Sequence, residues 1–414
     1  MEHRRDGEQI VSGSGLSHGR LGRLHDVLGQ HVERGDVTGL TGLVGLVARR
    51  GEVHADGMGT VTPDGAPAGP DTIFRISSLT KPVAAVAAMI LVEECRLRLD
   101  DPVHRLLPEL ADRRVLRRLD GPLDDTVPAS RPILVRDLLT FTMGLGAIMA
   151  APGTVPVADA LAEPALGQGP PSPAGTAAPD EWLALLGRLP LAHQPGAAWL
   201  YSTSADVLGV LIARAAGQPL EAFLRERVFG PLGMRDTGFS VPPQDIGRLA
   251  TSRRLDAETG KPVVYDEAAG GQWSRPPAFP SAAGGLVSTI NDYFAFTEML
   301  RAGGRHSAGR ILSRPSVELM TTDRLTAGQK AAGGLGPTFF DHHGWGFGMS
   351  VVTGRTGVKS VGTYGWDGGL GTVWHNDPAE DLIMILMTQQ MWASPTAPPV
   401  CEDFWTLVYQ AIDD

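Results

Sequence analysis

The chain has little cysteine and no long apolar run. Its two cysteines, Cys95 and Cys401, lie far apart and have neither metal-binding nor redox spacing. We interpret both as small buried side chains. The longest apolar run near the C-terminus, Leu382–Met387, has the length of a strand. No stretch approaches the ~18 apolar residues of a membrane span, so we predict no membrane-spanning helix.

Positive charge is also scarce. The net charge is −10, and no basic patch recurs along the 414 residues. Nucleic acid is therefore not predicted as a partner. Residues 1–20 are charged and lack the apolar core of a secretory signal. We expect an N-terminal tail at 1–20, one folded domain over 21–414, and a cytoplasmic protein. The sequence does not indicate the oligomeric state.

The order of patterns along the chain predicts an α+β fold built from both chain ends. A helix is expected at 21–34, two strands on either side of a turn at Arg50–Gly51, and a short strand at 73–77. After about residue 282, strands are expected at 344–352, 360–366, 371–378 and 382–389, before a closing helix from 399. We expect one antiparallel sheet built from both ends, with the terminal helices on one face.

The middle of the chain is predicted to be helical. This assigns 21–76 plus 282–414 to an α/β subdomain and 77–281 to a helical subdomain. The segment Leu79–Leu97 is apolar nearly all round, which indicates a buried helix. Further short helices are expected at 135–141, 180–189, 203–217 and 219–233. The Pro/Ala/Gly-rich insertion at 146–180 is interpreted as a lid, a binding loop or a disordered loop.

Lysine is rare, and its placement is informative. The four lysines are Lys81, Lys261, Lys330 and Lys359, whereas arginine is common. Lys81 follows Ser77 and Ser78 between a predicted strand and the buried helix, and either serine would share a helix face with it.

Burial would lower the pKa of Lys81. A neutral amine can accept a proton from a serine hydroxyl, which an arginine cannot do. A helix N-terminus would also favour developing negative charge near the serines. In the alternative interpretation, Ser77 and Ser78 cap a helix and Lys81 lies on the surface.

Two other stretches carry candidate site residues. Tyr201, one of five tyrosines, directly precedes a predicted helix, where it either reaches a cleft or belongs to the core. Gly368, Gly369 and Gly371 lie within a predicted strand. Glycine is costly in a strand unless the backbone closely approaches a ligand or forms a bulge.

Together these motifs resemble those of the serine β-lactamase and penicillin-binding-protein superfamily, above all its class C-like branch of carboxylesterases and acyltransferases. Ser-x-x-Lys matches Ser78–Lys81, the tyrosine motif matches Tyr201–Thr203, and the third motif matches Trp366–Gly368. The likeness extends from about Leu21 to the C-terminus.

The resemblance implies a β-lactamase/transpeptidase-like fold and an acyl-enzyme mechanism. Ser78 would be the nucleophile, and Lys81 and Tyr201 would share proton transfer, with either as the base. The N–H groups of Ser78 and Gly369 would form the oxyanion hole. The remaining residues implied in substrate binding are Trp366, which would line the acyl pocket, Asp367, Gly368 and Thr203. No metal or other cofactor is implied.

Two departures from the family pattern bear on the substrate. Thr203 stands where asparagine is frequent, and the third motif lacks its usual cationic residue. Arg355–Gly357 is interpreted as a hairpin tip. Both departures favour an ester over a β-lactam.

We therefore predict a serine hydrolase of small-molecule carboxylic esters. The alternatives are an acyltransferase with the same intermediate, a β-lactamase or D-amino-acid peptidase, and a non-catalytic scaffold. His342 and His343 show no zinc-type spacing with carboxylates.

Overall fold

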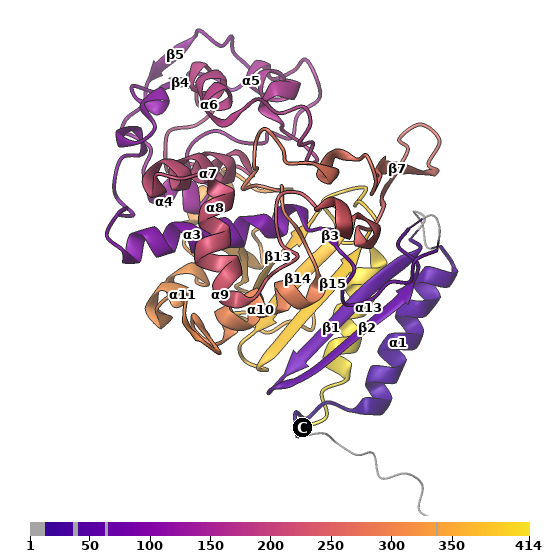
Figure 1. The fold of residues 1–414 in the computed structure, drawn as a ribbon. Coiled ribbons are helices and arrows are strands. Elements are labelled where there is room, and N and C mark those ends of the chain that lie inside the picture. Colours follow the sequence, from indigo (N-terminus) through magenta and orange to yellow (C-terminus); the bar gives the residue numbers. More distant parts are fainter. Residues whose placement is uncertain (1–12, 36–39, 63–64, 337) are drawn as a thin grey trace, which may run out of the picture.

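A sheet built from both ends of the chain forms the centre of the molecule (Figure 1). The computed structural model describes residues 13–35, 40–62, 65–336 and 338–414. Within them, seven strands form an antiparallel sheet in the order β11-β12-β13-β14-β15-β1-β2. Their bounds are Gly42–Arg49 (β1), Glu52–Gly59 (β2), His343–Trp345 (β11), Ser350–Val352 (β12), Tyr364–Gly368 (β13), Thr372–Asp377 (β14) and Leu382–Thr388 (β15). The predicted α+β fold is confirmed.

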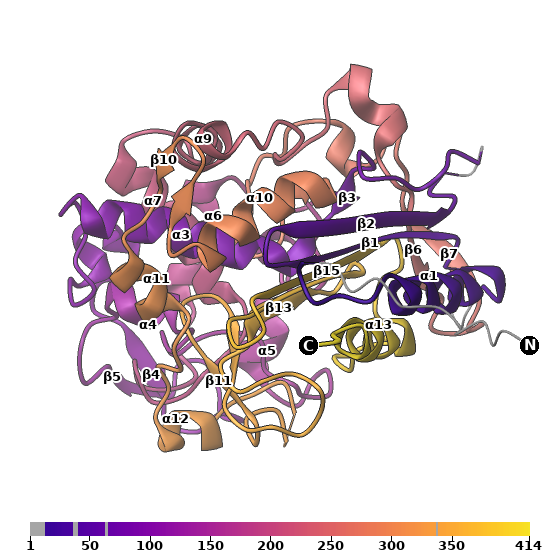
Figure 2. The same ribbon diagram turned by 90° about the horizontal axis from the view of Figure 1, so that it is seen from below.

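Both faces of this sheet are buried. The terminal helices α1 (His18–Glu33) and α13 (Pro399–Gln410) lie together on one side, and α3 (Thr80–Glu93) and α10 (Ile290–Arg301) lie on the other (Figure 2). Along β15, Leu382, Met384 and Leu386 pack on the terminal helices. Their neighbours Ile383, Ile385 and Met387 face the helical part. Successive strand residues point to opposite faces, so a strand covered on both sides is apolar throughout.

The middle of the chain is helical, as predicted. Helix α3 (Thr80–Glu93) is buried at every residue from Thr80 to Leu91. The other helices are α4 (Val135–Leu139), α5 (Pro156–Leu161), α6 (Pro179–Arg188), α7 (Thr203–Ala216), α8 (Leu220–Leu224), α9 (Gly230–Leu232), α10 (Ile290–Arg301), α11 (Arg314–Met320) and α12 (Ala327–Ala331). Small two-stranded sheets pair β3 (Phe74–Arg75) with β8 (Val287–Ser288), β4 (Arg114–Leu116) with β5 (Thr126–Pro128), β6 (Ser252–Leu255) with β7 (Pro262–Asp266), and β9 (Arg305–His306) with β10 (Gly309–Arg310).

Three strand predictions differ from the structure. The segment 344–352 is not one strand but the hairpin of β11 and β12. Its bend contains Gly348 at φ +72°, where a Cβ would lie 2.9 Å from the Lys81 carbonyl oxygen, so this turn packs directly on α3. Strand β3 pairs with β8 and stays outside the main sheet. Gly369 and Gly371 belong to the turn between β13 and β14 rather than to a strand, since Gly371 has φ +103°.

Other expectations also need correction. Cys95 is exposed, because it follows the end of α3, whereas Cys401 is buried as predicted. The insertion 146–180 is no bare loop, since it contains α5 and buries Leu161 and Leu166 in the core. Of the expected tail 1–20, residues 1–12 lie outside the described residues and α1 begins at His18.

No single helix in the described part of the chain has the length and apolar composition to cross a membrane. The segments Thr203–Ala216 and Leu220–Leu232 meet those criteria only as a pair, which is bent by 78°.

Candidate active site

Ser78 lies in a tight turn directly before α3. Residues Ser77–Leu79 form one 3-10 turn, and no side chain caps this turn or α3. The capping interpretation of the two serines is therefore wrong. Ser77 is buried and has φ +47°, a left-handed conformation that is uncommon for a residue with a side chain. The turn is held by Thr80, whose hydroxyl donates to the Ser77 carbonyl (2.7 Å).

Lys81 is buried and points at Ser78. Its side chain is 2% exposed, so the surface interpretation is wrong as well. Nζ donates to Ser78 Oγ (2.9 Å) and to the Ala283 carbonyl (2.6 Å). Burial lowers the pKa of Lys81 to about 7, against the opposing charge of Asp206. The amine is therefore substantially neutral near pH 7 and can accept a proton.

Asp206 is a site residue that the sequence prediction missed. It lies in the first turns of α7, and its carboxylate accepts from Ser281 Oγ (2.8 Å) and from the Ala283 N–H (3.0 Å). It thereby holds the loop whose carbonyl accepts from Lys81. Burial raises the pKa of Asp206. A single acid in the apolar stretch Ala205–Ile212 was the available signal, because an isolated acid in such a segment needs a buried partner.

Tyr201 lies beside both Ser78 and Lys81. Lys81 Nζ lies 4.4 Å from the centre of the Tyr201 ring. The phenol oxygen accepts from Trp366 Nε1 (2.7 Å). Burial raises the pKa of Tyr201, and hydrogen bonds to Ser78 and Trp366 oppose this only in part. Tyr201 therefore remains a neutral phenol that can donate and accept.

An aromatic cluster fixes the Tyr201 ring. Trp199 stacks at 5.7 Å between ring centres, and Trp366 lies at 5.6 Å. The other rings within contact of this group are Phe141, Phe339, Phe340 and Trp345. Such packing holds the hydroxyl in one place without a large loss of entropy on substrate binding.

The end of β13 runs directly beside the serine turn. A Cβ on Gly368 would lie 2.5 Å from the Ile76 carbonyl oxygen, so only glycine fits there. Thr372 on β14 donates to the same carbonyl (3.0 Å). Gly369 follows, and its carbonyl accepts from the Trp392 N–H (2.9 Å). Among the turn and loop hydrogen bonds of the described chain, none has the Gly369 N–H as its donor.

These groups open into a cavity of about 280 Å³. Ser78, Tyr201, Trp366, Asp367 and Gly369 line it, and we call it the catalytic cavity. The remaining lining is mostly apolar: Ser77, Gly169, Pro170, Pro171, Leu335, Phe339, Leu370, Met391, Trp392, Ser394 and Pro395.

Of the predicted site residues, Thr203 lies away from the catalytic cavity and Asp367 lies between two cavities. Thr203 is fully buried and donates to Gln168 Oε1 (3.0 Å), and it does not line the catalytic cavity. Asp367 also lines a neighbouring polar cavity of about 600 Å³, together with Lys359 and His375. Burial raises the pKa of Asp367 to about 6, against the charge of Lys359. The described residues contain no group of three or more His, Cys, Asp or Glu side chains placed to hold a metal ion.

Comparisons with known proteins identify what the whole chain is similar to. A family model described as Beta-lactamase matches residues 29–398. Protein Rv1367c of Mycobacterium tuberculosis is 44% identical over 331 residues, covering 78% of this chain and 79% of that protein. Esterase EstB of Burkholderia gladioli is 32% identical over 379 residues, covering 87% of this chain and 88% of that protein. The solved structure of EstCE1, a hydrolase with promiscuous acyltransferase activity, has a TM-score of 0.74 at 26% identity and covers 96% of this chain and 99% of its own.

Proposed function

The chain belongs to the beta-lactamase family, and from this premise we propose that it is a serine hydrolase cleaving carboxylic esters through an acyl-enzyme on Ser78. The similarity to EstB and EstCE1 supports ester hydrolysis or acyl transfer in general. The observation that carries the specific mechanism is the buried Lys81 amine, 2.9 Å from Ser78 Oγ.

Lys81 is assigned as the base for acylation. Its pKa of about 7 leaves the amine about half neutral at pH 7, whereas the pKa of Tyr201 is raised. Ser78 Oγ attacks the ester carbonyl while its proton passes to Lys81. The proton then moves through Tyr201 to the departing alkoxide, which leaves as an alcohol. Water then attacks the acyl carbon and gives up one proton, which passes through Lys81 and Tyr201 to Ser78 Oγ as the acyl–Oγ bond breaks and the acid is released.

The oxyanion is stabilised by backbone groups. We assign this role to the N–H groups of Ser78 and Gly369, because both residues line the same cavity and Ser78 lies in the turn directly before α3. Fixed dipoles aimed at the developing charge are worth several kcal/mol in a site that excludes water (~2.7–4 kcal/mol per donor). Trp366 donates to Tyr201 and so positions the phenol, while its ring forms part of the wall.

The lining favours an ester over a β-lactam. No lysine or arginine is among the residues that line the catalytic cavity, all of which lie in the described chain. A substrate carboxylate would find no cation there and would instead face Asp367. Thr203 likewise offers no amide for a substrate carbonyl and is buried away from the cavity.

An acyltransferase remains the second candidate, because EstCE1 is described as a hydrolase with promiscuous acyltransferase activity. In both reactions the same acyl-enzyme forms, and the acceptor decides the product. Gly169–Pro171, from the insertion 146–180, line the catalytic cavity where an acceptor would enter. Added alcohol would divert the acyl group from water in proportion to its occupancy of that site.

The test combines turnover with adduct mapping. p-Nitrophenyl acetate and butyrate should be hydrolysed and nitrocefin should not, and added methanol should reveal any transfer as the methyl ester. A fluorophosphonate should label Ser78, and the label should persist in Ser77→Ala but be lost in Ser78→Ala. An adduct on another residue, or hydrolysis of nitrocefin in preference to the esters, would contradict the proposal.

A further inference from the structure

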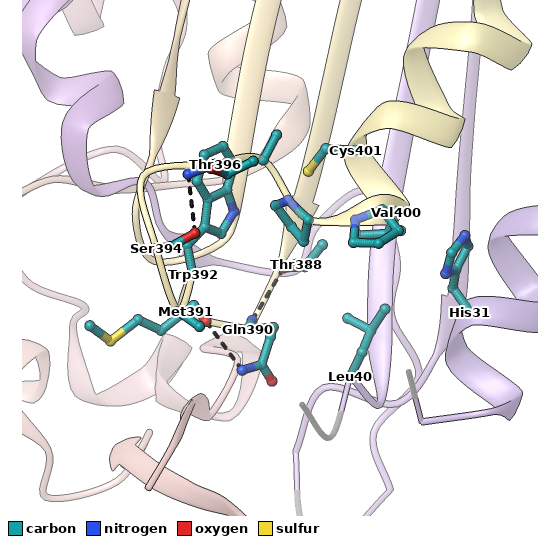
Figure 3. A pocket seen from close by; sticks show the side chains of 14 residues that line it. His31, Leu40, Thr388, Gln390, Met391, Trp392, Ser394, Thr396, Val400 and Cys401 are labelled. Carbon is teal, nitrogen blue, oxygen red and sulfur yellow. Dashed lines mark hydrogen bonds between the residues drawn. The ribbon is translucent and has the colours of Figure 1, made fainter. Parts of the chain in front are cut away.

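A second cavity lies behind the loop that follows β15 (Figure 3). Its volume is about 270 Å³, close to that of the catalytic cavity. Leu40, Thr388, Ala397, Val400 and Cys401 are among the residues that line it. Among the described residues that line it, the only ionisable groups are His31, which contacts the Asp403 carboxylate (2.8 Å), and the Cys401 thiol, whose pKa burial raises. We call it the rear cavity.

The rear cavity and the catalytic cavity are both lined by the loop that follows β15. Met391, Trp392 and Ser394 line both cavities. The start of this loop is anchored, because the Met391 N–H donates to the Arg253 carbonyl (2.8 Å) and the Trp392 N–H to the Gly369 carbonyl (2.9 Å). The only main-chain bond from Ala393 to Ala397 within the described chain is local, from the Thr396 N–H to Ser394 Oγ (3.2 Å). The wall that the two cavities share is thus formed by Met391, Trp392 and Ser394, and the last of these lies in a short stretch with little backbone support.

We propose that the rear cavity receives the distal end of an apolar acyl chain, so that the substrates are medium- and long-chain esters. This inference rests on the proposed esterase function. We assign the acyl part of the ester, rather than its alcohol part, to the rear cavity. The reason is that the loop is hydrogen-bonded to Gly369, the residue whose N–H would hold the acyl carbonyl oxygen. An acyl chain that leaves this carbonyl therefore starts beside Trp392.

Volume and polarity support this occupant. The catalytic cavity, at about 280 Å³, falls just below the ~300–1,000 Å³ that small-molecule sites usually have. The rear cavity adds a comparable volume with a largely apolar wall. A largely apolar wall requires an occupant that loses little on leaving water, because burying apolar surface is favourable and burying a charge is costly. A methylene chain meets that requirement and an ionised group does not.

The test is a chain-length series on the full chain. kcat/KM is measured for p-nitrophenyl acetate, butyrate, octanoate, dodecanoate and palmitate, with dodecyl acetate as the matched ester that carries its long chain on the alcohol. Each methylene entering the rear cavity should raise kcat/KM about fourfold, until the cavity is full. Ala397→Phe, which fills the rear cavity, should lower the dodecanoate-to-butyrate ratio at least tenfold. Ala111→Phe, at an exposed alanine that lines neither cavity, should leave that ratio unchanged.

The outcomes separate the two proposals. Failure to hydrolyse any ester would remove the proposed function itself. Hydrolysis of short esters with no gain from longer acyl chains, or a gain confined to the alcohol chain, would overturn the rear-cavity inference alone. An unchanged ratio in Ala397→Phe would do the same. Val400→Phe repeats the filling test from the wall formed by α13, in case the first variant melts at a lower temperature.

Discussion

Replacing Lys81 by arginine tests the centre of the proposed mechanism. The variant keeps a positive charge and a hydrogen-bond donor beside Ser78 and the Ala283 carbonyl, but it removes the group that can be neutral. Because a guanidinium also donates hydrogen bonds, the buried Ala283 carbonyl keeps a donor. The fold should therefore survive, and the loss should appear in catalysis.

The structure sets the size of the loss. With a pKa of about 7, Lys81 is about half neutral at pH 7. An arginine ordinarily has a pKa of 12.5, and even strong burial, as at Arg113 in the same molecule, lowers it only to about 10. At pH 7 such a guanidinium would be neutral in about one molecule in a thousand. The expected fall in kcat/KM is therefore at least about 500-fold, above the ~100-fold minimum for loss of a positioned base.

The assay is hydrolysis of p-nitrophenyl butyrate between about pH 5 and pH 9, with thermal unfolding as the control for folding. In the wild type the base must be deprotonated, so kcat/KM should fall as the pH drops through about 7. In Lys81→Arg this inflection should leave the measured range. A folded variant that kept more than a tenth of kcat/KM, with an inflection still near pH 7, would refute proton transfer by Lys81.

Three further predictions follow from neighbouring groups. Tyr201→Phe should lower kcat ~100-fold or more, measured with p-nitrophenyl butyrate, while the free energy of unfolding changes by only about 1 kcal/mol; a near-normal kcat would return Tyr201 to a packing role. Asp206→Asn removes the charge that raises the pKa of Lys81, so the acid limb of the kcat/KM profile should move to lower pH; no movement would contradict this coupling. Gly368→Ala should lower the melting temperature, at a cost of about 1–3 kcal/mol, because its Cβ would press on the serine turn. Gly369→Ala, where a Cβ meets nothing within 4 Å, should melt at the temperature of the wild type. Equal melting temperatures of Gly368→Ala and Gly369→Ala would contradict the close packing of Gly368 on the serine turn.

The sequence predicted the fold well where a pattern is local and repeated. Helix α3 was predicted to be buried because it is apolar on all sides, and β15 was recognised from its continuous apolar run. The sequence failed where a contact with a distant segment sets the backbone. The hairpin at Gly348 bends because α3 lies against it, and nothing within 344–352 reports this contact. Cys95 was misplaced because the apolar pattern does not mark where α3 ends.

Of the candidate site, the sequence by itself determined which residue types were available. It placed Ser78 and Lys81 on one helix face, and it singled out lysine because the chain otherwise uses arginine. The same scarcity applies equally to Lys261, Lys330 and Lys359. Only the tertiary structure separates them, because a pKa depends on burial and neighbours rather than on residue type. Lys330 pairs with Asp323, and Lys359 lies over the Trp405 ring.

The partners of Lys81 likewise come from distant parts of the chain. Tyr201 precedes α7, Asp206 lies within it, and the Ala283 carbonyl belongs to a later loop. The burial that these segments produce removes water from the amine and lowers its pKa to about 7, against the opposing charge of Asp206, and no spacing along the chain could specify this. The sequence supplied a lysine, and the packing of segments about 120 and 200 residues away along the chain makes it a base.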